Sequence, residues 1–556
     1  MSTDVELSKK KGNDQSFLSA RDTPKPLLAL MYGFQQVMVC VSALLTVPFL
    51  VTDTLCAGSD STILLNELIS STFVVSGLST IIQTMFGMRL ALLQGTAFAY
   101  VPSVQVFMGQ CLVNSSTPVP KSEYYSKLAL MQGSLMAAAC MPMLIGFTGV
   151  VGVLTKFIGP LTVSPLMLLL AFSQVGTMVD KISLHWVAAI QAVTLFITIL
   201  YLADVLVVLP GIKRGKLHWY RTNLFGQYPY LIAIVISWVF CVVLTVFNLV
   251  EPGSPARVDI PRKVSAIRNS AWIAVPYPGK FGMPSFDVSL FLAFLLSSMT
   301  SVFESVGDYH AAARVSQERS PPSHAINRGI LAEGMGTLLS GLLGPAVGMT
   351  THTENIGVIG VTRVASRWTM VVAGLLLIVL GVSTKIGAIL STIPDPLVGG
   401  ILGSSMAMVV GVAVSNLQTV DMSISRNMGI LGFSMLFGMI VPEYFKRYPV
   451  DTGVHVFDDV INVLLKLQMF VGAMCACFLD NTVGGATREQ RGLRPRGIIH
   501  EISIDDDTYS YSPIIMKFLN KVPFINYFPC VPKEKKATNK VAEYLSDDHK
   551  ASEVRL

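Results

Sequence analysis

The residues with the clearest chemistry in this chain are carboxylates inside apolar segments, and the first of them is Glu354. It lies in the stretch 351–363, directly before Asn355 and close to Gly357 and Gly360. A carboxylate at the bilayer centre costs roughly 2.5–3.5 kcal/mol on insertion scales, so we expect Glu354 to face a site rather than lipid. The two glycines suit a short or interrupted helix with close backbone approach. The alternative is a polar loop between two helices.

Three further acids lie upstream of this stretch. Glu304 and Asp308 end a long apolar run and are four residues apart, so they share one helical face. Such a pair indicates either a site or the end of a helix at the membrane interface. Glu333 lies next to Gly334 in another apolar segment, which predicts helices packed around a polar centre.

The composition is that of a protein embedded in a membrane. The 556 residues are 52% hydrophobic and only 14% charged, whereas soluble domains average about 25% charged. Several apolar runs reach the ~20 residues that a bilayer core demands. The net formal charge of +6 comes without a basic stripe interleaved with aromatic residues, so nucleic-acid binding is not predicted.

Motifs of catalysis are missing from the sequence. We find no nucleophile–base arrangement, no phosphate loop and no His-Glu-x-x-His, and the eight cysteines lack metal-ligand spacing. We therefore expect neither an enzyme nor a bound cofactor or metal. A transporter is the leading interpretation, and a channel or a non-transporting receptor is the alternative.

Hydropathy predicts about fourteen membrane elements between two cytoplasmic tails, residues 1–25 and 481–556. The third and tenth elements are irregular, with glycine, threonine or proline, so we expect short extended pieces buried in protein or lining a cavity. Each is the third element of its half, and matching interrupted segments indicate an inverted-repeat transporter with a site at the midplane. The predicted elements are 26–51, 62–87, 88–108, 125–154, 157–178, 184–209, 229–250, 286–313, 325–344, 351–363, 368–390, 397–416, 427–444 and 461–480.

The loops give partial evidence on topology. Asn114 begins a glycosylation sequon in a loop that should be extracellular, in agreement with a cytoplasmic N-terminus and three crossings. Cys56 and Cys111 lie in loops on that same side, so a disulfide between them is possible. The loop up to residue 285 also falls outside, yet it is basic, against the positive-inside tendency. Its basic residues are Arg257, Arg262, Lys263 and Arg268.

These motifs together carry a resemblance to a known family. The segment Glu354–Arg363 matches the whole signature Gln/Glu/Pro-Asn-x-Gly-x-x-x-x-Thr-Arg/Lys/Gly. The chain thus resembles the nucleobase–ascorbate transporter family, and its animal members in particular, over residues 30–495. Further matching patches are Gln94-Gly95-Thr96 with Phe98, Glu304-Ser305-x-Gly307-Asp308-Tyr309, Glu333-Gly334, Asp480-Asn481-Thr482 and Arg491-Gly492-Leu493.

The resemblance implies an all-α membrane fold of fourteen spans in a seven-plus-seven inverted repeat. A core domain would comprise residues 26–154 and 286–390, and a gate domain residues 155–285 and 391–480. The gate domain would form a homodimer, and the core would move against it as an elevator. The protein would lie in the plasma membrane with both termini in the cytoplasm.

The resemblance also assigns roles to residues. Glu304 and Glu354 would bind the N–H and carbonyl edges of a planar heterocycle, because carboxylates accept strongly from ring N–H groups. Phe98 would stack on the ring, beside the backbone of Ala97. Asn355 would fix the broken helix. The further assignments are Gln94 at the substrate, Asp308, Glu333, Gln36 and His352 in cation coupling or support, and Thr362 and Arg363 in selectivity.

Substrate and cation stay open at this stage. Family nucleobase transporters have Gln or Glu at the first signature position, whereas animal ascorbate transporters have Pro. Glu354 therefore favours a base such as uracil, xanthine or urate, while the animal character of the chain favours sodium-dependent ascorbate transport. The family's first-span Gln-His is here Gln35-Gln36, and an amide cannot titrate. His352 could titrate near neutral pH, so either Na⁺ or H⁺ could be the coupling cation.

Overall fold

The structure is a computed structural model that describes residues 17–109, 119–151, 157–202, 204–213, 216–222, 224–493, 508–511, 521 and 528–531. Eight of its helices are long and apolar enough to cross a membrane, or ten if each of two bent pairs is counted as one span. They are α1 (Pro26–Leu55), η1 with α2 (Gly58–Asp60 and Ser61–Met85), α4 (Lys121–Thr148), α6 with α7 (Pro160–Ser173 and Val175–Ile182), α10 (Pro229–Val246), α12 (Val288–Val315), α17 (Asp395–Leu417) and α18 (Ser425–Arg447). This supports a polytopic, largely helical membrane protein. The count of fourteen, the repeat and the two domains remain predictions.

Two predicted spans are sharply bent rather than continuous. α15 (Arg367–Val382) meets α16 (Thr384–Leu390) at 83°, and the end of α19 (His455–Lys466) meets α20 (Gln468–Thr482) at 77°. At the first bend the loop before α12 supplies bonds, because the Ala274 N–H donates to the Val382 carbonyl over 3.0 Å. The carbonyl left free by the break is thereby satisfied.

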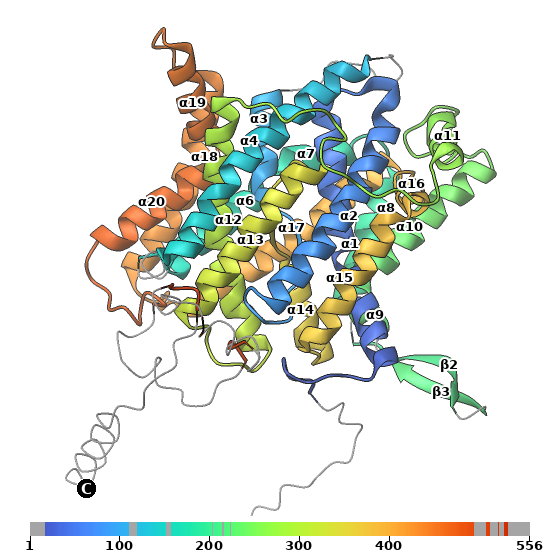
Figure 1. Cartoon of the computed structure of the whole chain (residues 1–556), viewed down its shortest axis with the longest axis horizontal. Helices are drawn as coiled ribbons and strands as arrows, with labels where there is room; N and C mark the ends of the chain where they lie inside the picture. Colours follow the sequence, from blue (N-terminus) through green and yellow to red (C-terminus); the bar gives the residue numbers. More distant parts are fainter. Residues whose placement is uncertain are drawn as a thin grey trace, which may run out of the picture.

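The predicted span 184–209 is wrong at its end. α8 (Val187–Phe196) continues into a π-helical turn, η3 (Ile197–Tyr201), and then the chain forms an antiparallel hairpin of β2 (Val207–Lys213) and β3 (Lys216–Thr222). Pro210 and Gly211 fall in the first strand, where a helix would be broken by the missing N–H and the ring of proline. The prediction of an all-α fold with only two short extended pieces is therefore wrong here, because the chain also contains this hairpin. Figure 1 shows the hairpin projecting from one corner.

The middle of the molecule is a tight stack of helices. In Figure 1, α1, α2, α12, α13 (Ser323–Leu343) and α15 gather at the centre, with α18 to α20 on one side and α10, α11 (Pro261–Asn269) and α16 on the other. α2 and α15 cross at Gly77 and Gly374. A Cβ on Gly77 would lie 2.4 Å from the Gly374 carbonyl oxygen, so only glycine permits this approach, as is common between membrane helices.

The basic loop before α12 carries charges that are compensated locally. Arg257 donates two hydrogen bonds of 2.7 Å to Asp259 and one of 2.9 Å to the Val250 carbonyl. These bonds to Arg257 hold the pKa of the Asp259 carboxyl below its usual value. Lys263 is buried, donates to the Ile393 carbonyl and lies 3.9 Å from Asp395. Two of the four basic residues of this loop are therefore paired with acids inside the protein.

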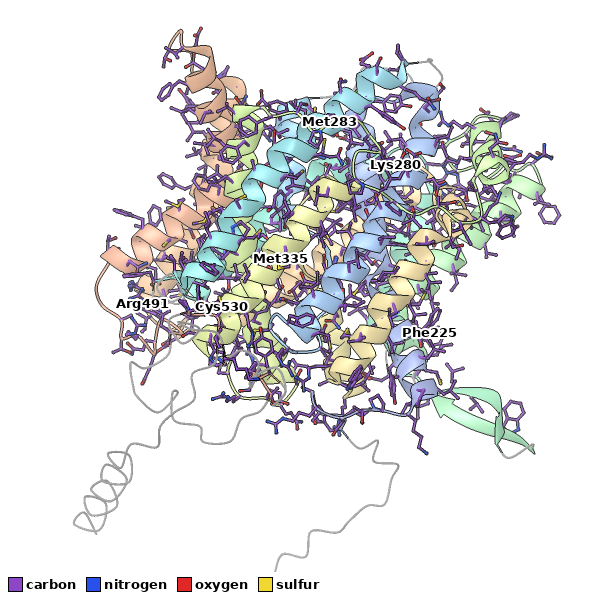
Figure 2. All side chains as sticks on the ribbon, in the orientation of Figure 1. Phe225, Lys280, Met283, Met335, Arg491 and Cys530 are labelled. Atoms are coloured by element: carbon purple, nitrogen blue, oxygen red, sulfur yellow. The ribbon has the colours of Figure 1, made fainter. Side chains whose placement is uncertain are left out.

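Parts of both predicted tails pack on the helices at one end of the molecule. Arg21 donates to the Thr508 hydroxyl over 2.9 Å, and Arg328 of α13 donates to the Tyr509 carbonyl over 2.7 Å. Tyr509 is fully buried. Figure 2 shows Cys530 and Arg491 at this same end, with Lys280 and Met283 at the other. The described parts of the two tails therefore lie on one face, which agrees with termini on one side of the membrane.

A buried acid joins α18, α20 and the segment that follows α20. Asp480, with no exposed side-chain surface, accepts bonds of 2.9 Å from Arg426 and a bidentate pair, also 2.9 Å, from Arg491. One ion cluster thus joins two motif patches that are separate in the sequence, Asp480-Asn481-Thr482 and Arg491-Gly492-Leu493.

Removing the acid from this cluster should destabilise the protein. In Asp480→Ala two guanidinium groups lose their shared carboxylate, and breaking a buried pair costs about 3–5 kcal/mol. We expect a lowered midpoint of thermal unfolding for the detergent-solubilised protein. The control is Glu443→Ala, which breaks an exposed pair with Arg447 and should cost no more than about 1 kcal/mol. Equal midpoints for the two variants would contradict a structural role for Asp480.

Candidate functional site

Two short strands cross in the centre of the helix stack. β1 (Gln94–Thr96) pairs antiparallel with β4 (Met349–Thr351), in the register Gln94↔Thr351, Gly95↔Thr350 and Thr96↔Met349. The ladder extends at both ends, because the Ala97 N–H donates to the Gly348 carbonyl and the His352 N–H to the Leu93 carbonyl. The extended piece predicted in the third element is therefore confirmed. The second piece, β4, shares only Thr351 with the predicted tenth element 351–363 and so begins two residues earlier. The two pieces bind each other.

The outer edges of this ribbon are satisfied by side chains. The Gln94 N–H donates to the Thr80 hydroxyl of α2 over 2.9 Å, and the Met349 N–H donates to the Thr337 hydroxyl of α13 over 3.0 Å. Non-helical backbone at membrane depth needs such internal partners. The sequence reasoning did not single out Thr80 or Thr337, and a lone threonine in an apolar helix gives no signal for this role.

Helices lead away from the ribbon on both sides. After β1 the chain forms a 3-10 turn, η2 (Phe98–Tyr100), and then α3 (Val101–Met108); after β4 it forms α14 (Thr353–Thr362). Both helices begin beside the ribbon, so their N-terminal N–H groups and the positive ends of their dipoles lie at the centre of the molecule. Glu354 falls in the first turn of α14, where that dipole stabilises a carboxylate.

Asn355 joins the two predicted halves of the chain by hydrogen bonds. Its Oδ1 accepts from the Leu93 N–H over 2.9 Å, and its Nδ2 donates to Gln36 Oε1 of α1 over 2.8 Å. This geometry is what the predicted role of fixing the broken helix requires. Gln36 is bound as a structural partner here, and the neighbouring Gln35 Nε2 has no hydrogen-bond partner among the described residues.

Glu333 is surrounded by donors. Its carboxylate accepts from Ser305 over 2.5 Å, from Tyr309 over 2.7 Å and from Thr351 over 2.9 Å. Gln94 in turn donates to the Thr351 hydroxyl over 2.8 Å. Glu333 thus joins α12, α13 and β4, a position suited to support rather than to direct contact with a solute. Ser305 and Tyr309 were seen only as parts of a motif; their four-residue spacing was the available signal that both face one partner.

Glu304 and Glu354 differ from Glu333 in having unused acceptors. Glu304 is 5% exposed and Glu354 is 2% exposed, yet Glu304 Oε2 and Glu354 Oε1 have no hydrogen-bond partner within the described chain. Glu304 is within electrostatic reach of both Glu354 and Glu333. A buried carboxylate oxygen without a donor costs free energy, so these two atoms are the ones that an N–H-bearing solute would satisfy.

His352 and Asp308 extend this acidic group. His352 Nδ1 lies 3.2 Å from Glu354 Oε2, while its Nε2 is buried without a partner among the described residues. Asp308 contacts the Thr353 hydroxyl at 3.4 Å. No three His, Cys, Asp or Glu side chains of the described residues are grouped so as to hold a metal ion.

The remaining predicted residues divide between the ribbon and the far end of α14. Ala97 and Phe98 directly follow β1, and Phe98 is 7% exposed. Thr362 and Arg363, by contrast, end α14, about 13 Å along the axis from Glu354. Arg363 is exposed at the face that carries both tails, and its carbonyl accepts from the Leu18 N–H. This position suits a residue at the rim of the site and not one at its centre.

Three predictions, on the disulfide, the glycosylation sequon and the glycines of α14, are tested only in part. Cys56 is disulfide-bonded, whereas Cys111 and the sequon at Asn114 lie outside the described residues. Gly357 and Gly360 lie within an unbroken ten-residue α14. The interruption of this membrane element comes earlier, at His352, where the strand turns into the helix.

Comparison with known proteins identifies the family. A sequence model described as "Permease family" matches residues 28–447. The chain belongs to the nucleobase–ascorbate transporter family. It is 34% identical to human "Solute carrier family 23 member 2" over 92% of this chain and 81% of that protein, and 35% identical to mouse "Solute carrier family 23 member 1" over 92% and 88%. "Nucleobase-ascorbate transporter 6" of Arabidopsis thaliana is 29% identical over 84% and 87%.

The family is one of membrane transporters, so this chain is a transporter and not an enzyme. Among solved structures, the transmembrane domain of a cyanobacterial bicarbonate transporter, BicA, matches 72% of this chain and 98% of its own length, with a TM-score of 0.46 and 12% identity.

Gly95 should tolerate no side chain. A Cβ there would lie 1.9 Å from His352 Nε2, so Gly95→Ala must displace the histidine or the strand, and overpacking of this kind costs about 1–3 kcal/mol. We expect uptake by Gly95→Ala to fall at least about tenfold. Replacing His352 by serine should make room for the added methyl group. The double variant Gly95→Ala/His352→Ser should therefore lose a smaller share of uptake relative to His352→Ser than Gly95→Ala loses relative to the unmodified chain. Full uptake by Gly95→Ala would contradict the placement of His352 over the ribbon.

Tyr309→Phe should loosen the support around Glu333. The variant removes one of the three donors to this carboxylate and the acceptor of Gln83, which donates to the tyrosine hydroxyl over 2.7 Å. A buried polar group left unsatisfied costs about 1–3 kcal/mol, so the thermal midpoint of the purified protein should fall. Tyr201→Phe, at an exposed position, is the matched control. If the two variants unfold together, the bond to Glu333 contributes nothing.

Proposed function

We propose that this protein is a cation-coupled secondary transporter of nucleobases such as uracil, xanthine or urate. The observation that carries the proposal is the pair of unpartnered acceptors on Glu304 and Glu354 beside two helix N-termini. A nucleobase presents ring N–H groups and carbonyl oxygens along one edge. The carboxylates would accept from the N–H groups, and the backbone N–H groups at the helix starts would donate to the carbonyls.

The ribbon supports the proposed alternating-access movement. Thr80 and Thr337 make equivalent bonds to β1 and β4 from α2 and α13, the second elements of the two predicted halves. Such equivalence agrees with an inverted repeat. The core domain, residues 26–154 and 286–390, would then carry the site as one body against the gate domain, residues 155–285 and 391–480. A homodimer through the gate domain, in the plasma membrane with cytoplasmic termini, belongs to the same proposal.

The contact between His352 and Glu354 bears on the coupling cation. His352 Nδ1 lies 3.2 Å from Glu354 Oε2, so a proton could pass between these two groups, and this contact supports H⁺ as the cation. Gln36 takes no part in such a transfer, because an amide does not titrate. Na⁺ coupling is the second candidate and rests on the similarity to animal members.

Sodium-dependent ascorbate transport is the alternative function, because the names of the plant relatives include both nucleobase and ascorbate. Ascorbate is an anion, and a second negative charge between Glu304 and Glu354 would be repelled. The geometry therefore favours a base.

Substitution at the two glutamates tests the proposal. We expect Glu304→Ala and Glu354→Ala each to lower uptake of a labelled base by at least about 100-fold, since each removes a charge-assisted bond in a buried site. Cell-surface amounts should be unchanged. Glu251→Ala, at an exposed position, is the matched control. Uptake like that of the unmodified chain in both glutamate variants would contradict the site.

Glu354→Pro adds a test of substrate class. Position 354 is the second residue of α14, where proline is tolerated because the helix N-terminus lacks an internal acceptor for that N–H. If the first signature position sets substrate class, this variant should lose uptake of the base and gain measurable uptake of ascorbate. Retained uptake of the base would contradict a direct contact by Glu354.

A further inference from the structure

A cavity of about 750 Å³ opens away from the carboxylate site. Its lining includes Asp53 and Cys56 near the end of α1, Gln105 of α3 and Lys181 of α7. α1 begins at the face that carries the tails and runs about 35 Å to Phe49, its first residue in the cavity wall. The cavity therefore opens at the opposite face, which is extracellular if the tails are cytoplasmic.

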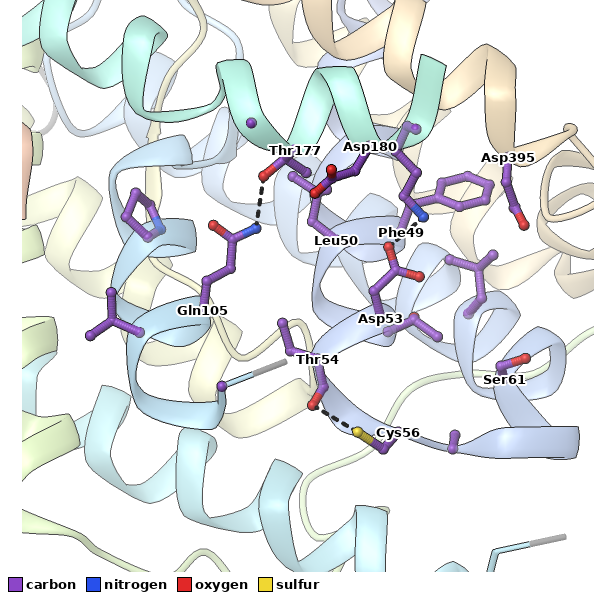
Figure 3. A pocket seen from close by; sticks show the side chains of 18 of the residues that line it. Phe49, Leu50, Asp53, Thr54, Cys56, Ser61, Gln105, Thr177, Asp180 and Asp395 are labelled. Atoms are coloured by element: carbon purple, nitrogen blue, oxygen red, sulfur yellow. Dashed lines mark hydrogen bonds and ion pairs between the residues drawn. The ribbon is translucent and has the colours of Figure 1, made fainter. Parts of the chain in front are cut away.

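Charged side chains surround the opening. Figure 3 shows Asp53, Asp180 and Asp395, from α1, α7 and α17, around one space. Five basic side chains line the same cavity against these three acids, so its formal charge is positive. The basic residues are Lys181, Arg262, Lys263, Lys446 and Lys466.

The positive and negative groups are not evenly distributed. Lys181 lies 2.6 Å from Asp53, and Lys263 lies 3.9 Å from Asp395, so two of the acids are paired with lysines. Lys446 lies in the last turn of α18 and Lys466 ends α19, and neither has an acidic partner within 4.0 Å among the described side chains. These two lysines form the positive side of the cavity, where an added anion would gain most.

Apolar side chains complete the walls. Phe49 and Leu50 of α1, Pro102 and Val106 of α3, and Met469 of α20 line the cavity. A pocket with apolar walls and a few charged groups is typical of sites for small organic molecules, and this volume lies within their usual range of about 300–1,000 Å³.

The cavity also spans the boundary between the two proposed domains. Asp53 and Gln105 lie in the proposed core, whereas their partners Lys181 and Thr177 lie in the proposed gate. A molecule bound here would contact both proposed domains.

We propose that this cavity binds small organic anions, such as the urate anion. A positive, low-dielectric opening raises the local concentration and the association rate of anions, and salt screens this effect.

Binding is tested in the purified full-length chain with Glu304→Ala and Glu354→Ala, so that the carboxylate site does not contribute. Radiolabelled urate is the probe, at about 0.01 M ionic strength, where the Debye length is about 30 Å. Adding Lys446→Gln and Lys466→Gln should weaken urate binding about 3- to 10-fold. Adding Arg447→Gln, which neutralises an exposed neighbour paired with Glu443, should change little. Equal binding by the lysine and arginine variants would overturn the anion site.

Discussion

β1 and β4 exchange backbone hydrogen bonds in the middle of the helix stack, and the architecture of the site depends on this pairing. Backbone that is not helical must find all its partners within the protein at membrane depth. The ribbon, with the hydroxyls of Thr80 and Thr337 and the amide of Asn355, supplies them. The pairing fixes where η2 with α3 and α14 begin, so it also fixes where Phe98 and Glu354 lie.

The buried carboxylates divide into two kinds around this ribbon. Glu333 accepts from Ser305, Tyr309 and Thr351 and joins three elements, so the protein itself satisfies its carboxyl oxygens. Glu304 and Glu354 each keep an oxygen without a partner in the described part of the chain. The first kind holds the structure in place, and the second kind provides acceptors that a solute or a proton would satisfy. This division gives physical content to a motif that is otherwise only a string of residues.

Much of this arrangement could be predicted from the sequence. Charges inside apolar runs identified Glu304, Glu333 and Glu354, and irregular composition identified the extended piece of the third element and placed the other within two residues, because each signal is local. The pairing of the strands and the bond between Asn355 and Leu93 join residues more than 250 positions apart, and no local pattern contains them. The hairpin β2–β3 was missed because its first strand continues the apolar run of the preceding helix. The bends within 368–390 and 461–480 were missed because hydropathy measures length and not direction.

Uptake of radiolabelled uracil, xanthine, urate and ascorbate, measured in parallel in transporter-deficient cells, tests the central claim most directly. Each solute is supplied in sodium medium and in choline medium, at neutral and at mildly acidic pH. The account predicts accumulation of at least one base, competition among the bases and no accumulation of ascorbate. Uptake that persists in choline and rises in acid would identify H⁺ as the cation, and uptake lost in choline would identify Na⁺. Accumulation of ascorbate alone would contradict the assignment of Glu304 and Glu354 as acceptors for a nucleobase.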